Sequence, residues 1–156
     1  MKKLVLLCAI FLTTMVSCKK EATSEVDGDV VDAPKKPELT QVCYEGILKN
    51  DTITMQLSMT GTDVRSGELK YNFFEKDKNT GHISDIRQAG DTLLANYAFL
   101  SEGKMSYREV VFLRKGNILI EGYGDVEADS TGKMIFKDKK KIFFDSKTIL
   151  AKINCK

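Results

Sequence analysis

Residues 107–113, YREVVFL, place two adjacent charges inside an apolar run. Successive side chains of a strand point to opposite faces, so each face of this segment carries one charge. Either Arg108 or Glu109 must therefore share the apolar inner face, where an unpaired charge costs several kcal/mol. That charge is a buried structural polar tie, a charge at the open mouth of a barrel, or the polar anchor of a ligand pocket, with nearby tyrosines as hydrogen-bond donors.

The candidate binding residues are Tyr107, Arg108 and Glu109. We expect Glu109 to point inward, because its face also carries Tyr107, Val111 and Leu113. Arg108 would then lie outside.

Other residues with catalytic chemistry are few. His82 is the single histidine and follows a glycine in a turn, which favours a surface position. The chain has no nucleophile elbow, no HExxH and no phosphate-binding loop. Asp125, Glu127 and Asp129 alternate, but Ser130 stands where a calcium loop needs glycine and no bidentate glutamate follows. We therefore expect a non-enzymatic protein without metal or cofactor.

The charge balance argues against nucleic acid as a partner. The full chain has 24 basic and 22 acidic side chains. Lys2 and Lys3 belong to a predicted signal peptide, and its removal leaves equal numbers of each sign. Nucleic-acid binding needs a concentrated basic face, which a neutral chain does not favour.

The first residues predict export and a lipid anchor. Two lysines precede an apolar stretch, residues 4–16, which is shorter than the ~20 residues that cross a bilayer and fits a secretory signal. The stretch ends in Met-Val-Ser-Cys, similar to a lipoprotein cleavage box with Met in place of Leu. We expect residues 1–17 to be removed and Cys18 to carry lipid. The alternative is a plain secreted chain with Cys18 in a disulfide.

Residues 18–40 are predicted to be a disordered tether. They hold both prolines and many charges, and too few apolar side chains to offset the entropy of ordering. Lys20-Glu21 loosely resembles an export tag of surface lipoproteins. We expect an outer membrane lipoprotein, attached to the membrane by its lipid and facing the periplasm or the cell surface.

Two cysteines remain if Cys18 is lipidated and Cys8 is removed with the signal. Cys43 and Cys155 stand near the two ends of the folded part, in a compartment where disulfides persist. A bridge between them requires their alpha carbons to lie within about 7 Å. The first and last strands would then be neighbours.

From residue 41 onward the hydrophobic pattern alternates with period two, and turn residues follow at even spacing. The pattern predicts an all-β domain, residues 41–156: a small antiparallel up-and-down β-barrel of about eight strands, closed by the disulfide. A barrel of that size is either filled by its side chains or holds one small ligand. We expect a mostly filled interior. The strands are expected at residues 42–48, 51–60, 68–73, 82–88, 93–99, 105–115, 117–126, 132–137 and 148–153.

Several short motifs carry a resemblance. They are Cys43-Tyr-Glu-Gly46, residues 75–81 (EKDKNTG), Ser101-Glu-Gly103, Arg108-Glu-Val110, Glu121-Gly-Tyr-Gly124 and the terminal Cys155. With these the chain resembles a group of small envelope lipoproteins from Bacteroidota-type bacteria over the whole domain. The resemblance implies a lipid-anchored envelope protein. The plan is more distantly similar to lipocalin-like proteins, envelope-stress lipoproteins and membrane-bound lysozyme inhibitors, and no functional residue is carried over from them.

Two functions follow from these expectations. The first is a lipid-anchored barrel that binds a small apolar or amphipathic ligand or an envelope protein. The alternative is a periplasmic protein-protein module, such as a lysozyme inhibitor or a stress sensor. A wide apolar cavity would favour ligand carriage, whereas a filled barrel with an exposed loop patch would favour a protein partner.

Overall fold

The computed structural model describes residues 38–156 apart from residues 75 and 77. The predicted signal peptide, the lipidation site at Cys18 and nearly all of the predicted tether lie outside the described residues. In the described residues, the secondary structure consists of strands and one short 3-10 helix. Its elements are β1 (Leu39–Leu48), β2 (Asp51–Thr60), β3 (Asp63–Asn72), β4 (Asn79–Ala89), β5 (Thr92–Ser101), β6 (Lys104–Lys115), β7 (Ile118–Tyr123), β8 (Val126–Ala128), β9 (Met134–Phe136), η1 (Lys139–Lys141) and β10 (Phe143–Ile153).

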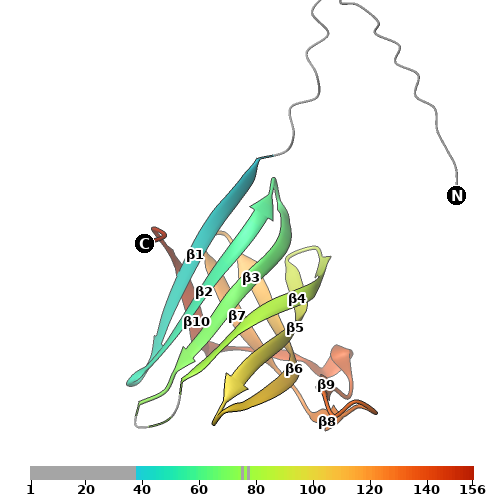
Figure 1. The fold of residues 1–156 in the computed structure, drawn as a ribbon. Coiled ribbons are helices and arrows are strands. Elements are labelled where there is room, and N and C mark those ends of the chain that lie inside the picture. Colours follow the sequence, from blue (N-terminus) through green and yellow to red (C-terminus); the bar gives the residue numbers. More distant parts are fainter. Residues whose placement is uncertain (1–37, 75, 77) are drawn as a thin grey trace, which may run out of the picture. The chain divides into compact units, whose positions relative to one another are not determined.

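Eight of the strands close into an antiparallel barrel (Figure 1). β1 to β7 follow one another around the wall, and β10 fills the place between β7 and β1. Tight turns join most neighbours, as the even spacing of turn residues predicts. The predicted all-β up-and-down barrel is confirmed.

The eighth wall strand differs from the expectation. The segment expected as a strand at residues 132–137 contributes only β9, which forms a small outer hairpin with β8 and meets β6 at a single position, Arg108 opposite Met134. The wall is completed by β10, which begins at Phe143 instead of residue 148. Residues 124–142, here called the crossover segment, connect β7 to β10 along the outside of the barrel.

Alternation along the strands builds the core. Met55 and Leu57 on β2, Leu69 on β3, Leu119 on β7 and Leu150 on β10 are each at most 1% exposed. Side chains of one parity meet at the barrel axis because a strand alternates its two faces. These residues fill the centre of the barrel with apolar side chains.

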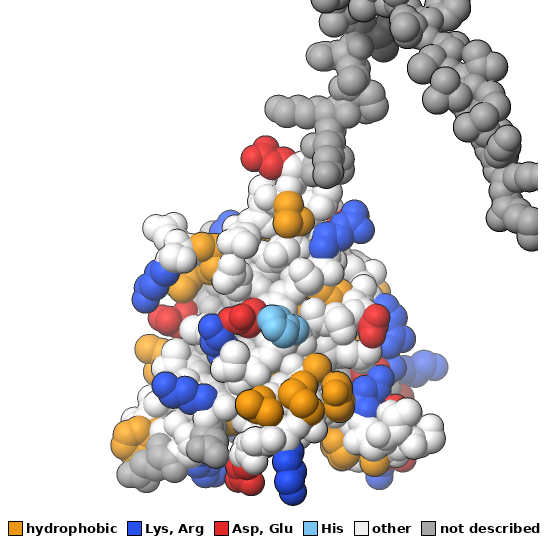
Figure 2. Space-filling model, viewed as in Figure 1, with side chains coloured by type: hydrophobic (Ala, Val, Ile, Leu, Met, Phe, Trp, Pro, Cys, Tyr) orange, Lys and Arg blue, Asp and Glu red, His pale blue; other side chains and the backbone are white. Residues whose placement is uncertain are grey.

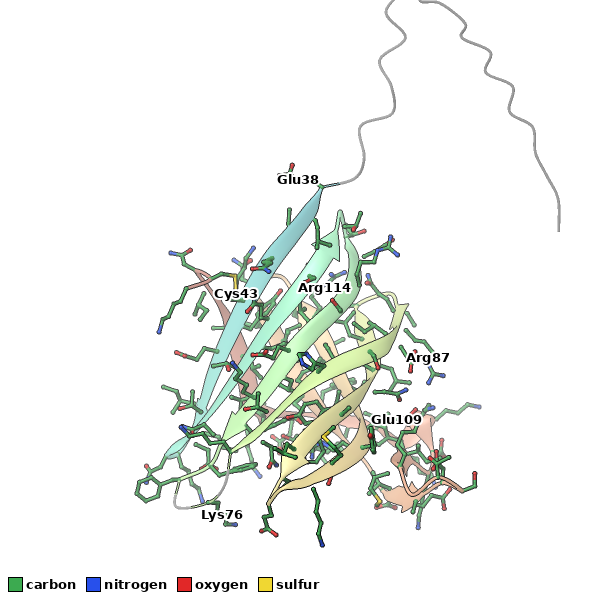
Figure 3. All side chains as sticks on the ribbon, in the orientation of Figure 1. Glu38, Cys43, Lys76, Arg87, Glu109 and Arg114 are labelled. Carbon is green, nitrogen blue, oxygen red and sulfur yellow. A yellow bond between two sulfur atoms is a disulfide. The ribbon has the colours of Figure 1, made fainter. Side chains whose placement is uncertain are left out.

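The disulfide joins the first and last barrel strands. Cys43 and Cys155 are bonded, with their alpha carbons 5.2 Å apart. Cys43 lies opposite Ile153 in the register of β1 and β10, so the bond reinforces the pair of strands where the two ends of the chain meet. The predicted disulfide is confirmed. Figure 3 marks Cys43 on this side of the barrel.

The two ends of the barrel differ. One, here called the loop end, carries the β1–β2 turn, the longer β3–β4 connection, the β5–β6 turn and the crossover segment. β1 begins at the other end, at Leu39 (Figure 1). Within the described part of the chain, no helix is long and apolar enough to span a bilayer.

Candidate functional site

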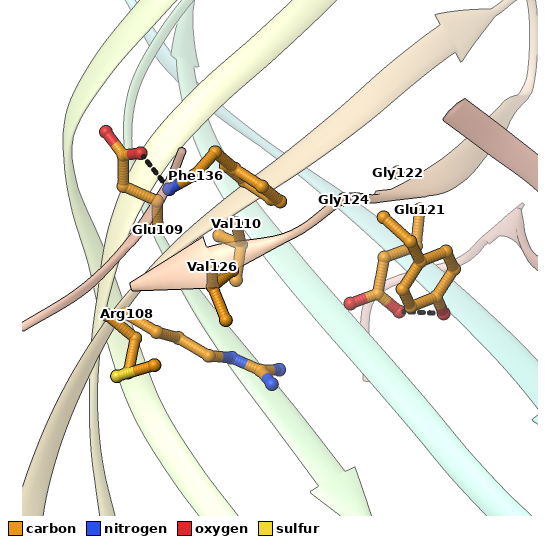
Figure 4. Close-up of a pocket in the computed structure, with 10 residues that line it drawn as sticks. Arg108, Glu109, Val110, Glu121, Gly122, Gly124, Val126 and Phe136 are labelled. Carbon is orange, nitrogen blue, oxygen red and sulfur yellow. Dashed lines mark hydrogen bonds between the residues drawn. The ribbon is translucent and has the colours of Figure 1, made fainter. Parts of the chain in front are cut away.

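The inward charge on β6 is Arg108, not Glu109. Val110 and Phe112 share the parity of Arg108 and belong to the core cluster inside the barrel. Glu109 points to the outside, and Figure 4 shows the two side chains leaving β6 in opposite directions. The expectation of an inward Glu109 was wrong. Both faces of this part of β6 are apolar because both are buried: the inner face lies in the barrel core, and the crossover segment covers the outer face. The alternation of apolar residues therefore did not show which face is the inner one.

Arg108 is surrounded by aromatic rings near the loop end. The carbon of its guanidinium lies 5.0 Å from the ring centre of Tyr71, 5.5 Å from that of Tyr97 and 5.7 Å from that of Phe99. These distances are those of cation–π contacts, which stabilise a desolvated cation by roughly 1–2 kcal/mol. The rings come from β3 and β5, so two strands of the barrel wall supply the aromatic surroundings of the arginine.

A buried carboxylate shares this region. Glu121 on β7 is 6% exposed, and it accepts hydrogen bonds from the hydroxyl of Tyr71 at 2.6 Å and from that of Tyr123 at 2.9 Å. Because Tyr123 donates its proton to Glu121, the Tyr123 hydroxyl oxygen accepts the hydrogen bond from the hydroxyl of Thr148, 2.8 Å away. Tyr71, Tyr97, Arg108, Glu121 and Tyr123 are here called the mouth cluster.

The tyrosines of the mouth cluster remain protonated across the physiological range. Burial raises the pKa of Tyr71 well above its ordinary value, and the charge of Glu121 raises it further. Burial likewise raises the pKa of Tyr123 to about 12. Tyr97 is fully buried, and its hydroxyl donates to the backbone carbonyls of Leu69 and Asn79. Two of the hydroxyls therefore act as fixed donors to Glu121, and the third is held by the backbone.

The barrel wall has an opening between β6 and β7, beside the mouth cluster. β5 and β6 pair along their full length, from Thr92 opposite Leu113 to Ser101 opposite Lys104, whereas β6 and β7 pair only from Phe112 to Lys115. Below that point the two strands diverge, and β8 and β9 lie across the opening. A side pocket of about 250 Å³ occupies it (Figure 4), lined by Arg108, Glu109, Val110, Glu121, Gly122, Tyr123, Gly124, Val126, Met134 and Phe136.

Glu109 fastens the crossover segment to the wall. Its carboxylate accepts a hydrogen bond from the backbone N–H of Phe136 at 3.0 Å and pairs with Lys139 at 3.0 Å and Arg87 at 3.5 Å. Burial alone would raise the pKa of Glu109, but the hydrogen bonds from Lys139 and Phe136, with the nearby positive charges, hold it below its ordinary value. Figure 3 shows Arg87 and Glu109 on the same side of the barrel.

Tyr107 takes part in neither arrangement. It is 51% exposed and lies on the outer face of β6, like Met105 on the same strand. Met105 faces Leu100 across the β5–β6 pair, and both are at least half exposed. Figure 2 shows hydrophobic side chains gathered near the loop end of the visible face, below the single histidine. The three candidate residues of the sequence thus lie in three environments. Arg108 belongs to the mouth cluster, and Tyr107 lies on an exposed apolar surface. Glu109, with its bonds to Phe136, Lys139 and Arg87, forms an outer contact that is here called the clasp.

Several residues of the site were missed at the level of sequence. Glu121 shares its parity with Leu119, which was a usable signal, but Ile118 and Ile120 make the other face equally apolar. Tyr71 and Tyr97 lie in the strands expected at residues 68–73 and 93–99, but alternation alone does not show that their rings meet Arg108. Within the described residues, no group of three or more metal-ligating side chains is close enough to hold a metal ion.

Comparison with protein-family models, with curated proteins and with solved structures gives no significant match, so the function has to be inferred from the geometry of the chain itself.

Proposed function

We propose that the protein is a lipid-anchored binding protein of the bacterial envelope, whose barrel takes a small amphipathic ligand at the side pocket. The observation that carries this proposal is the opening between β6 and β7, where an apolar pocket meets the polar mouth cluster. Ligand sites typically combine apolar walls with a few convergent polar groups. The centre of the barrel is filled by side chains, so the ligand belongs at the opening and not along the barrel axis.

The proposed ligand is small. A volume of about 250 Å³ falls just below the ~300–1,000 Å³ of typical small-molecule pockets. Such a pocket suits a compact molecule or one end of a longer one. Among the described residues, the centre of the barrel is filled and is not a wide apolar cavity, so a ligand carried inside the barrel is less well supported than a ligand bound at the opening.

An envelope protein as partner is the second candidate function, in the manner of an inhibitor or a stress sensor. It is favoured by the exposed apolar side chains near the loop end, Phe74, Leu100, Met105 and Tyr107, each at least half exposed. A filled barrel with an exposed patch fits recognition of a protein surface. The barrel has both a filled centre and a side pocket, so its geometry is compatible with either function. Purification of the protein from native membranes, described next, should distinguish the two functions.

For the ligand, full-length protein purified from native membranes should retain a small molecule detectable by native mass spectrometry. Val126 lines the side pocket on β8, and Val126→Trp should displace that molecule by filling the space. Ala128 lies on the same short strand but does not line the pocket, so Ala128→Trp is the matched control and should keep the molecule. Equal retention by both variants would contradict the assigned pocket, and co-purified protein without any small molecule would favour the second function.

For the anchor, Cys18→Ser should block labelling of the protein by a fatty-acid analogue and leave the precursor unprocessed. The reason is that lipid attaches to the thiol that follows the cleavage box. Cys8→Ser changes the other cysteine of the N-terminal region and should label normally. Undiminished labelling of Cys18→Ser would refute the anchor without bearing on the pocket.

A further inference from the structure

Among the residues that the structure describes, Arg108 is a cation without an anionic partner. Among the described residues, no carboxylate lies within ion-pair distance of its guanidinium, whose buried Nε has no hydrogen-bond partner. Such a group carries a substantial desolvation cost, and buried guanidinium groups usually pair with an anion.

The surrounding rings do not satisfy the hydrogen-bonding capacity of Arg108. Tyr71, Tyr97 and Phe99 offer their π-systems at 5.0, 5.5 and 5.7 Å from the guanidinium carbon. Cation–π attraction stabilises the charge and orients the guanidinium group, but a ring face is a poor substitute for an oxygen acceptor. The rings therefore hold the planar guanidinium of Arg108 in place, and its N–H groups can still donate hydrogen bonds to a ligand.

Glu121 does not neutralise Arg108, although both line the side pocket. Each of its two carboxylate oxygens accepts one hydrogen bond, from the hydroxyl of Tyr71 or of Tyr123, and these bonds hold the carboxylate on the tyrosines. Among the described residues, Glu121 forms no ion pair with Arg108. In the part of the chain that the structure describes, the buried polar side-chain atom without a hydrogen-bond partner belongs to the cation, Nε of Arg108.

The other residues that line the side pocket indicate the chemistry of the ligand beyond its anionic group. Val110, Val126, Met134 and Phe136 line the same pocket and present apolar surface beside the guanidinium. In Figure 4, Arg108 and Val126 face the same space from β6 and β8. A ligand that satisfies both features has an anionic group at one end and a short apolar body at the other.

We propose that the side pocket binds a small monoanionic carboxylate, with its carboxylate on the guanidinium of Arg108 and its apolar body against Val126, Met134 and Phe136. This rests on the proposed ligand-binding function and names the chemical class of the ligand. A carboxylate matches the two-pronged geometry of arginine. A phosphate dianion would leave one negative charge uncompensated beside Glu121, so the monoanion is preferred.

The test uses four molecules with the same number of carbon atoms: hexanoate, hexan-1-ol, hexylamine and hexyl phosphate. Each is titrated into full-length protein in detergent, with a detergent blank, and the Kd is obtained from NMR chemical-shift changes. Hexanoate should bind at least tenfold more tightly than the alcohol, because a charge-assisted hydrogen-bond pair is worth about ten- to a hundredfold in affinity. The amine should bind most weakly.

Variants of Arg108 assign the effect. Arg108→Gln should weaken hexanoate by about ten- to a hundredfold and leave hexan-1-ol unchanged, while Arg108→Lys keeps the charge and should lie between. Arg114 is on the same strand near the opposite end of the barrel, so Arg114→Gln is the matched control and should bind hexanoate like the wild type. If Arg108→Gln does not fold, the hexanoate Kd of Arg108→Lys is compared with that of the wild type, and weaker binding by the lysine variant is expected.

Two results would overturn the inference. Equal binding of hexanoate and hexan-1-ol, or the absence of binding by both, would show that the guanidinium does not select a carboxylate. Tighter binding of hexyl phosphate than of hexanoate would show that the site takes a dianion. In each of these outcomes, the Val126→Trp and Ala128→Trp comparison with the natively retained molecule still decides separately whether the pocket binds a ligand.

Discussion

Replacing Cys43 and Cys155 together by alanine lowers the free energy of unfolding of the barrel by about 4–5 kcal/mol, the largest effect that we expect from a change in this protein. The bond closes a loop with a sequence separation of 112 residues, so its loss returns a large conformational entropy to the unfolded chain. Thermal unfolding should shift downward by on the order of 15 °C.

The double variant is preferred because a single change leaves one free thiol. Wild-type protein treated with a reductant under unfolding conditions should match the double variant, which controls for the loss of the cysteine side chains themselves. A double variant that melts within a few degrees of the oxidised wild type would show that the paired strands β1 and β10 hold the barrel closed without the bond.

Glu109→Ala should have the second-largest effect on stability, a loss of about 2–4 kcal/mol. The change leaves the buried backbone N–H of Phe136 without its acceptor, which costs about 1–3 kcal/mol. It also removes the pairs with Lys139 and Arg87, whose side chains are 46% and 64% exposed, so their contribution is limited to about 1 kcal/mol. Chemical denaturation of wild type and variant measures the difference.

Two variants serve as controls for Glu109→Ala. Glu127 is an exposed carboxylate on β8, and Glu127→Ala should change stability by less than about 0.5 kcal/mol. Arg108→Ala should also cost little, because the loss of its ring contacts is offset by the removal of an unsatisfied buried donor. Equal, small losses for Glu109→Ala and Arg108→Ala would contradict the clasp that Glu109 is inferred to form.

The clasp also predicts a pH dependence. The pKa of Glu109 in the folded protein lies below the ordinary value, about 4.3 for an unfolded glutamate. Its ionisation therefore adds stability above that ordinary value, and the added stability is lost as the pH falls through the lower, folded-state pKa. The difference in melting temperature between wild type and Glu109→Gln should therefore become smaller as the pH falls from the ordinary pKa of glutamate through the folded-state pKa of Glu109. A difference that does not change with pH would show that the charge of Glu109 does not contribute to stability.

The sequence by itself determined the barrel. Period-two alternation and regularly placed turn residues specify antiparallel strands, because each strand must bury one face and turn within a few residues. The positions of Cys43 and Cys155 near the two ends of the domain determined that the first and last strands meet, and the structure places their alpha carbons 5.2 Å apart. These features are local, or depend on a single pairing.

Only the tertiary structure decided which charge of β6 faces inward. Alternation tells the inside from the outside only when one face is polar, and here Val111 outside is as buried as Val110 inside. The outer face is buried because the crossover segment returns across it, a contact between β6 and residues some thirty positions later that no local pattern encodes. The mouth cluster depends in the same way on barrel closure, which brings Tyr71, Arg108 and Glu121 together from three strands.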